Sequence, residues 1–207
     1  MKDFLTLHPK DFWPEVRANQ FMKPTAGVCQ GYAQANLVIL PEKYALDFMM
    51  FCIRNPKPCP IIDIMDKGAY HPPLSPGADI RTDIPKYRVY TKGNLSDETT
   101  DILSLWQDDF VTFLLGCSFS FEWALLNKGI PIRHIEQSCN VPMYKTNMPC
   151  KEAGIFSGNT VVSMRPIKNK LIAKAVEITS RFPAVHGTPV HIGNPSDIGI
   201  LDLSAPD

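Results

Sequence analysis

Residues 116–122, with the sequence GCSFSFE, place a thiol, two hydroxyls and a carboxylate where an apolar run meets a predicted helix start. Backbone N–H groups at a helix N-terminus attract anions and favour the thiolate form of a cysteine. Cys117 or Ser118 could therefore hold a carboxylate or attack one. Glu122 follows Ser118 by four residues, which returns it to the same helix face as a candidate general acid or base. Both residues also have a purely structural interpretation. Ser118 could simply cap the helix, and Glu122 could simply be stabilised by the helix dipole in the first turn.

A polar stretch at residues 140–147 gathers amide, hydroxyl and ammonium groups around a proline. Such groups suit a small oxygen-rich ligand, although an ordinary loop with self-satisfied side chains is the simpler interpretation. Its candidate binding and catalytic side chains are Asn140, Tyr144, Lys145 and Asn147.

Two arginines lie where a ligand could reach them. Arg165 follows an expected strand at residues 160–164, and ligands of open α/β sheets bind at the carboxyl ends of strands. Arg81 lies in a loop, residues 68–85, whose length and irregular composition are typical of functional loops. A guanidinium matches a carboxylate bidentately, so the two arginines could grip a diacid. Each could equally pair with a neighbouring aspartate.

Two histidines lie in a glycine-rich turn near the C-terminus. His186 and His191 could shuttle protons, because histidine titrates near neutral pH. Asp197 or Asp202 could join them as a third metal ligand, but the spacing of the histidines matches no standard pattern, so no metal is expected. Turn histidines that bond to backbone carbonyls are the alternative. No glycine-rich phosphate loop is complete, and we therefore expect no nucleotide or other cofactor.

Composition limits the class of protein. The chain has 207 residues, which suits one domain over residues 1–207, and its 21 basic and 21 acidic residues cancel. Neither sign forms a long block, so nucleic acid and membrane surfaces are not expected partners. No apolar stretch approaches the roughly 20 residues of a membrane helix, and no export signal opens the chain. A cytoplasmic location and six free thiols are therefore expected, and homo-oligomerisation stays open.

Frequent prolines and glycines, 19 and 12 respectively, must keep the elements short. We expect a helical lead-in broken by Pro9 and Pro14, and a helix that starts at Pro41 directly after a strand. The apolar run at 110–115 could be strand or buried helix. Other helices are expected over residues 119–128 and 166–180, and strands over 35–40, 61–65, 87–91, 102–106, 160–164, 190–192 and 198–203. The pattern predicts a compact layered α/β (mixed α+β) domain with a mixed β-sheet and short helices.

Several long blocks resemble one known family over nearly the whole chain from Phe21. They read PTAGVCQGYAQANLVILP, DFMMFCIRNPKPCP, PGADIRTDIPKYRVY, FLLGCSFSFEWAL, NVPMYKTN, VVSMRP and HGTPVHIGNPSDIGI. Together they are similar to the putative hydro-lyase family, which includes the D-glutamate cyclase domain of vertebrate mitochondria. The resemblance implies a lyase that adds or removes water on a small amino acid or carboxylate, best attested as closure of D-glutamate to 5-oxo-D-proline. Relatives continue beyond Asp207, so this chain is expected to lack a C-terminal segment.

The resemblance does not assign roles, but the candidates suggest a mechanism. The two arginines and the backbone N–H groups after Gly116 would hold the carboxylates of an amino diacid. Glu122 or His186 would take the ammonium proton, and His191 or Tyr144 would help hydroxide leave. Orientation alone can recover roughly 7 to 11 kcal/mol of such a ring-closure barrier.

Two other functions stay open on the sequence. A cysteine or serine amidohydrolase would work through Cys117 or Ser118, although Ser120 occupies the last glycine position of the G-x-S-x-G motif. A non-catalytic metabolite-binding protein would bind ligand without turnover. All the catalytic hypotheses require Ser118 and Arg165 to lie together at one pocket.

Overall fold

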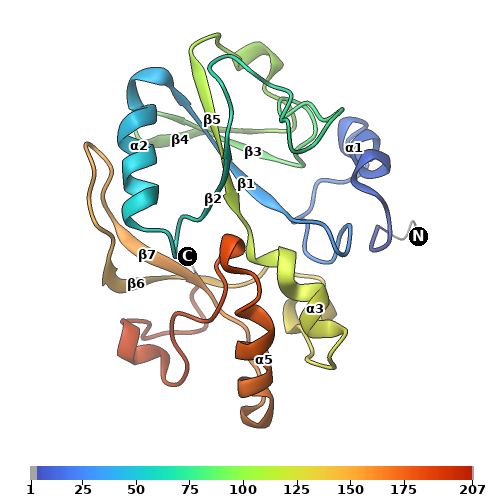
Figure 1. Ribbon diagram of the computed structural model, residues 1–207, viewed down its shortest axis with the longest axis vertical. Coiled ribbons are helices and arrows are strands. Elements are labelled where there is room, and N and C mark those ends of the chain that lie inside the picture. The colour runs from blue at the N-terminus through green and yellow to red at the C-terminus, as the bar shows by residue number, and fades with distance from the viewer. Residues whose placement is uncertain (1–3, 207) are drawn as a thin grey trace.

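A computed structural model of the chain describes residues 4–206. Its central sheet is antiparallel, in the order β1-β5-β2 (Figure 1). The middle strand carries the apolar run FVTFLLG, which is buried because it lies between two neighbours and under a helix. The strands of this sheet are β1 (Ala35–Pro41), β5 (Phe110–Gly116) and β2 (Ile61–Ile64). The run at 110–115 is therefore a strand.

Helix α2 (Glu42–Arg54) begins directly after β1, as the proline that precedes it predicts. Its buried face presents Phe48, Phe51 and Cys52 to the sheet. The ring centroids of Phe48 and Phe113 lie 4.9 Å apart in a T-shaped contact. The side chains between α2 and β5 therefore form one of the buried hydrophobic clusters of the molecule.

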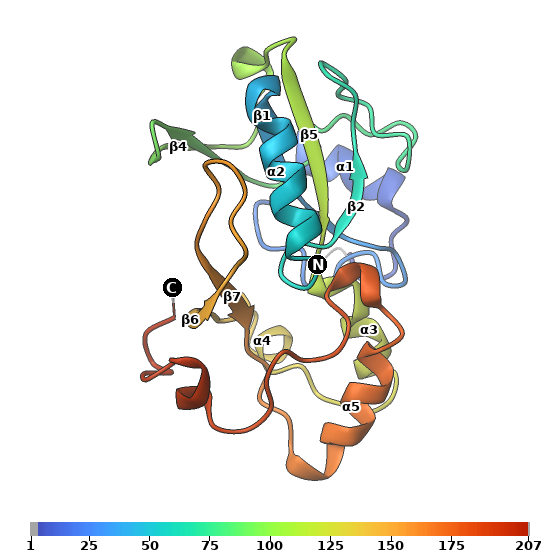
Figure 2. The same ribbon diagram turned by 60° about the vertical axis from the view of Figure 1, so that its left-hand side comes forward.

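Two hairpins flank the central sheet. The first pairs β3 (Tyr87–Thr91) with β4 (Asn94–Thr99), and the second pairs β6 (Met143–Pro149) with β7 (Asn159–Ser163). Both are antiparallel, and Figure 2 shows the loop of the second beside α2. Phe156 in that loop packs against Phe48 with 5.1 Å between ring centroids. The second hairpin is thereby attached to the same core as the sheet.

The lower half of the molecule is a cluster of short helices below the end of β5 (Figure 1). Leu125, Ile130, Ile132, Ala175 and Ile178 form its buried core. The elements are η2 (Ser118–Phe121), α3 (Glu122–Leu126), α4 (Arg133–Glu136), η3 (Asn169–Leu171), α5 (Ile172–Thr179) and η4 (Pro183–Val185). The remaining helical elements are α1 (Pro9–Arg17), η1 (Leu103–Leu105) and η5 (Pro195–Ile198). No helix within residues 4–206 is long and apolar enough to cross a membrane.

The expected mixed α/β class with short helices is confirmed, but the strands form three antiparallel sheets instead of one mixed sheet. The strand predicted at 102–106 is wrong, because Asp101 caps a 3-10 turn there through the Leu103 N–H. The strands predicted at 190–192 and 198–203 are also wrong. Asn194 caps a 3-10 helix instead, through the Ser196 N–H.

The helix boundaries that we predict from proline and serine positions differ from those in the structure. Pro9 opens α1, but Pro14 lies inside it instead of breaking it. The last long helix begins with a 3-10 turn at Asn169, not at Pro166. Ser118 makes no side-chain capping bond, because its hydroxyl contacts Arg165 instead. That contact leads to the candidate site.

Candidate functional site

Ser118 and Arg165 meet, although 47 positions separate them in the chain. Nη2 of Arg165 donates to Oγ of Ser118 over 2.9 Å. Ser118 opens η2 at the end of β5, and Arg165 follows β7, so the meeting joins the central sheet to the second hairpin. The two residues therefore lie together as the hypotheses require, but neither of them lines the small pocket beside α3.

Glu122 occupies the centre of the site and is almost fully buried. Its Oε1 accepts from Nε and Nη2 of Arg165 over 2.9 and 2.6 Å. Nε2 of His134 lies 3.0 Å from the same oxygen, at ion-pair distance but without hydrogen-bond geometry. The other oxygen, Oε2, has no hydrogen-bond partner among the described residues. Oε1 therefore has nitrogen atoms of both Arg165 and His134 beside it, whereas Oε2 has no hydrogen-bond partner among the described residues.

Neighbours on two sides hold the Arg165 side chain. Its Nη1 donates to Oγ of Ser163 over 2.9 Å, and its guanidinium carbon lies 5.3 Å from the centre of the Phe121 ring. Both Nε and Nη2 already serve Glu122. The bidentate edge expected to face a substrate carboxylate is therefore occupied by a carboxylate of the protein itself.

Glu122 also lines a small pocket between the 27–34 segment and α3. The segment is held in place by Gln34, whose side-chain amide donates to the carbonyls of Thr25 and Val28 over 3.1 Å each. Oγ of Ser120 accepts the Gln34 backbone N–H over 2.8 Å. The pocket encloses about 10 Å³, roughly the space of one water. Its lining is Gly27, Val28, Cys29, Gln30, Tyr32, Gln34, Phe119, Glu122, Trp123, Leu126 and Ile135.

Cys117 lies at the same junction, half-buried. Burial raises the pKa of its thiol. The Phe119 N–H and the Arg165 charge stabilise the thiolate and so lower the pKa, but the effect of burial is larger. The expectation of a favoured thiolate at this position is therefore wrong. The position precedes a four-residue 3-10 turn, which has a weaker dipole than a long α-helix.

His186 also reaches the junction. A Cβ on Gly116 would lie 2.1 Å from the Ala184 carbonyl oxygen, so only glycine lets η4 pack against the end of β5. The ring of His186 contacts the Lys57 carbonyl oxygen through Nδ1 over 3.0 Å and also bonds the Gly116 carbonyl. Burial lowers its pKa, and the charges of Lys57 and Arg165 act in the same direction. Burial and the two positive charges thus favour a neutral ring, which its contacts with backbone carbonyls hold in place.

His191 lies apart from this group. Its Nε2 is 2.9 Å from the Asn194 carbonyl oxygen and 3.9 Å from Oδ2 of Asp197. The contact is that of a turn histidine bonded to the backbone. Within residues 4–206 no three His, Cys, Asp or Glu side chains gather closely enough to hold a metal ion.

The polar stretch at 140–147 is largely a strand, β6, rather than a ligand-binding loop. Tyr144 is buried, and its hydroxyl donates to the Leu203 carbonyl over 2.8 Å. Asn140, Lys145 and Asn147 are exposed. The stretch therefore fastens the C-terminal segment through Tyr144, and its catalytic and binding roles remain predictions.

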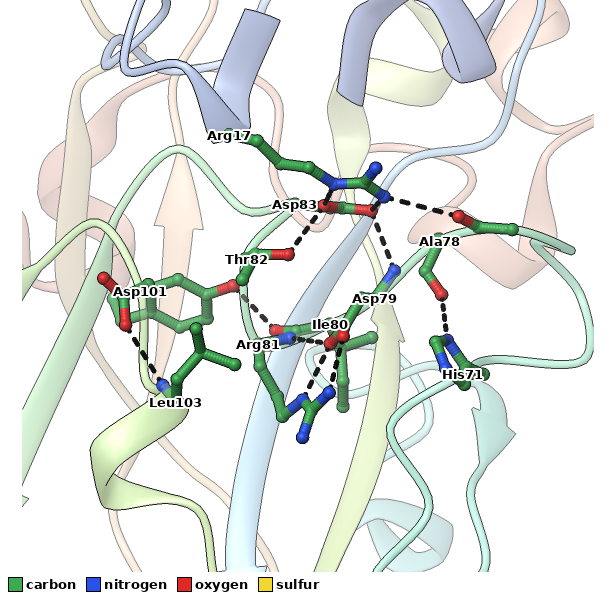
Figure 3. Close-up of polar contacts among 12 residues, drawn as sticks. Arg17, His71, Ala78, Asp79, Ile80, Arg81, Thr82, Asp83, Asp101 and Leu103 are labelled. Carbon is green, nitrogen blue, oxygen red and sulfur yellow. Dashed lines mark hydrogen bonds and ion pairs between the residues drawn. The ribbon is translucent and has the colours of Figure 1, made fainter. Parts of the chain in front are cut away.

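Arg81 belongs to a different cluster, drawn in Figure 3. Its Nη2 lies 2.7 Å from Oδ2 of Asp79, and its guanidinium carbon lies 3.4 Å from the centre of the Tyr70 ring. A second pair, Arg17 and Asp83, adjoins the first through the Asp79 N–H, which donates to Asp83. This is the pairing with neighbouring aspartate that the sequence left open. No contact among the described residues joins Arg81 to Arg165.

Sequence reasoning missed two residues of the site. His134 is a single histidine in a four-residue helix, and no spacing marks it. Gln34 lies in the PTAGVCQGYAQANLVILP block, so the resemblance pointed to its segment but not to its role. Both reach Glu122 or its pocket only through tertiary packing.

Comparisons with known proteins point to one family. The D-glutamate cyclase family profile matches residues 111–207. A protein of Geobacillus kaustophilus named a putative hydro-lyase is 60% identical over 193 residues, which are 93% of this chain and 73% of the relative. Putative hydro-lyase YcsI of Bacillus subtilis is 56% identical over 200 residues, 96% of this chain and 78% of the relative. A putative hydro-lyase of Natranaerobius thermophilus is 55% identical over 193 residues, 93% and 74% of the two chains.

Proposed function

This chain belongs to the hydro-lyase family that contains these relatives, and we propose that it closes D-glutamate to 5-oxo-D-proline with release of water. One observation carries the proposal. Glu122 is a buried carboxylate that lines a pocket, with one oxygen paired to Arg165 and the other without a partner. Such an oxygen suits the exchange of a proton with a bound amine.

The reaction needs no oxidant or reductant. Oε2 of Glu122 takes a proton from the substrate ammonium, and the free amine attacks the carbon of the side-chain carboxyl. A C–N bond forms, and the nitrogen then gives up a second proton, so that the lactam nitrogen keeps one of the three. Glu122 relays these two protons one after the other to the leaving oxygen, the C–O bond breaks, and the oxygen departs as water. The same group serves first as base and then as acid, so no second acid is required.

Arg165 and Ser118 supply the electrostatic part of the proposed site. The guanidinium pairs with the Glu122 carboxylate and places a positive charge beside the Ser118 hydroxyl. An anionic intermediate near Ser118 would be stabilised by that charge in a site shielded from water. The remaining Nη1 N–H and the Ser118 hydroxyl are the groups we assign to the substrate carboxylate.

The pocket must enlarge to admit an amino diacid, because it now has room for about one water. Its outer wall is the 27–32 segment, in which Gly27 and Gly31 have positive φ angles of 73° and 88°. Tyr32 at the end of this segment is exposed and lines the pocket. We assign the entrance to an outward movement of this segment.

NMR of purified protein with D-glutamate tests the proposal directly. We expect 5-oxo-D-proline to accumulate towards equilibrium, and we expect a Glu122→Gln variant to be slower by about 10²- to 10⁴-fold. Glu177→Gln, a change at an exposed ion pair, is the matched control. Absence of product from the wild-type protein, or full activity in Glu122→Gln, would contradict the proposal.

The two rival functions have distinct outcomes in the same samples. A covalent enzyme would form an adduct on Cys117 or Ser118 with an electrophilic substrate analogue, and mass spectrometry would detect it. The raised pKa of Cys117 argues against the thiol version. Thermal stabilisation by D-glutamate without any product would indicate a metabolite-binding protein instead.

A further inference from the structure

His134 lies beside the Glu122 carboxylate, and the next residue along the chain, Ile135, lines the pocket. His134 lies in α4, is 3% exposed, and its Nε2 is 3.0 Å from Oε1 of Glu122. Its ring also lies beside Phe119, with 6.0 Å between ring centroids. A histidine this deeply buried against a carboxylate needs an explanation that the ion pair with Arg165 does not provide.

Two polar atoms here lack a hydrogen-bond partner of good geometry among the described residues: Nε2 of His134 and Oε2 of Glu122. Buried polar atoms are normally hydrogen-bonded, and the exceptions call for a functional or structural reason. The two atoms belong to side chains that lie against each other, with Nε2 of His134 3.0 Å from the other oxygen of Glu122, and Glu122 lines the pocket. Both donated hydrogen bonds from Arg165 go to Oε1, and Oε2 is left without a partner among the described residues.

We propose that His134 is a positioning residue, which holds Oε1 of Glu122 in place so that Oε2 remains the oxygen that exchanges protons with the substrate. The inference rests on the proposed function and deepens it. The terminal torsion of a glutamate is broad, and both bonds from Arg165 go to one oxygen, so the carboxylate plane can still rotate about that contact. A second neighbour 3.0 Å from the same oxygen restricts this rotation. The charged or titratable groups that face Glu122 are Arg165, His134 and Cys117.

Kinetics of two His134 variants test the positioning role. His134→Phe keeps an aromatic ring but removes the nitrogen, whereas His134→Gln places an amide nitrogen near the position of Nε2. We expect His134→Phe to lower kcat about 10- to 100-fold with KM changed less than about two-fold, and His134→Gln to recover most of kcat.

His71→Gln is the control, because His71 is exposed and contacts Tyr70 and the Ala78 carbonyl oxygen, neither of which lines the pocket. Wild-type kcat in a folded His134→Phe protein would overturn the inference. Equal loss in the Phe and Gln variants would overturn it too, since that result indicates packing alone.

A measurement without turnover separates failure of this inference from failure of the proposed function. ¹⁵N NMR of the histidine rings reports which nitrogen carries the proton. We expect protonated Nε2 at His134 in the wild-type protein and an altered Nε2 signal in Glu122→Gln. If D-glutamate is not converted but this signal behaves as expected, only the substrate assignment fails. An unprotonated Nε2, or a signal indifferent to Glu122→Gln, would refute the positioning role.

Discussion

Arg165 and Glu122 form a buried ion pair, with 2.6 Å between Nη2 and Oε1. The pair links the residue after β7 to the first residue of α3, which are 43 positions apart. Taking two charges out of water is costly, and breaking such a pair leaves one charge buried alone. Its presence beside a pocket fits a functional site better than a device for stability.

Arg165→Met should destabilise the fold strongly. Removing one partner of a buried pair costs about 3 to 5 kcal/mol, because Glu122 is then buried without compensation. Arg181→Met, which breaks an exposed pair with Glu177, should cost less than about 1 kcal/mol. Urea unfolding of the two variants measures the difference. Equal free energies of unfolding would mean that the Arg165 pair is no more important than a surface contact.

Cys117 should alkylate slowly at neutral pH. Burial raises the pKa of its thiol, so less of the reactive thiolate is present at pH 7, and the labelling rate should rise with pH. Cys139 is exposed and serves as the internal reference. Mass spectrometry after a timed exposure to iodoacetamide gives both rates. Faster labelling of Cys117 than of Cys139 would show an activated thiol and revive the covalent alternative.

His186 should make stability depend on pH. Burial lowers its pKa in the folded protein below the ordinary 6.5, so the unfolded chain binds more protons as pH falls below that value. The free energy of unfolding should therefore rise with pH from the lowered folded pKa to about 6.5, and then level off as far as this group is concerned.

His186→Asn should flatten that dependence, because asparagine tolerates the left-handed conformation at this position, where φ is 78°. His8→Asn is the control, since His8 is exposed. Urea unfolding from about pH 5 to about pH 8 provides the comparison. An unchanged pH profile in His186→Asn would assign the dependence to other groups.

The 27–32 segment should open locally more often than the central sheet. Its backbone amides bond to loop carbonyls, for example Cys29 N–H to the Phe4 oxygen and Gln30 N–H to the Leu5 oxygen. Backbone amides in such loop contacts exchange their hydrogen with solvent faster than the amides of β5, which are bonded within the sheet. Hydrogen-exchange mass spectrometry should show faster exchange there and slower exchange when D-glutamate is added. Protection equal to that of β5 would argue against this segment as the entrance.

Particular elements show where sequence reasoning succeeded. The strand at 35–40, the helix after Pro41 and the strand at 160–164 were predicted within one or two residues, because apolar period and proline position are local signals. It failed at β6, where only alternate residues are buried and the stretch reads as polar. It also failed at 102–106, because an apolar run there forms a capped turn.

By itself, the sequence determined the mixed α/β class and the family, and it indicated the junction at 116–122 as a candidate site, since these depend on composition, local pattern and shared blocks. Tertiary structure alone decided that Arg165 binds Glu122 while Arg81 binds Asp79, and that His134 completes the carboxylate's surroundings. The physical reason is range. Propensity and capping act within a few residues, whereas charges and buried oxygens find their partners only after distant segments pack together.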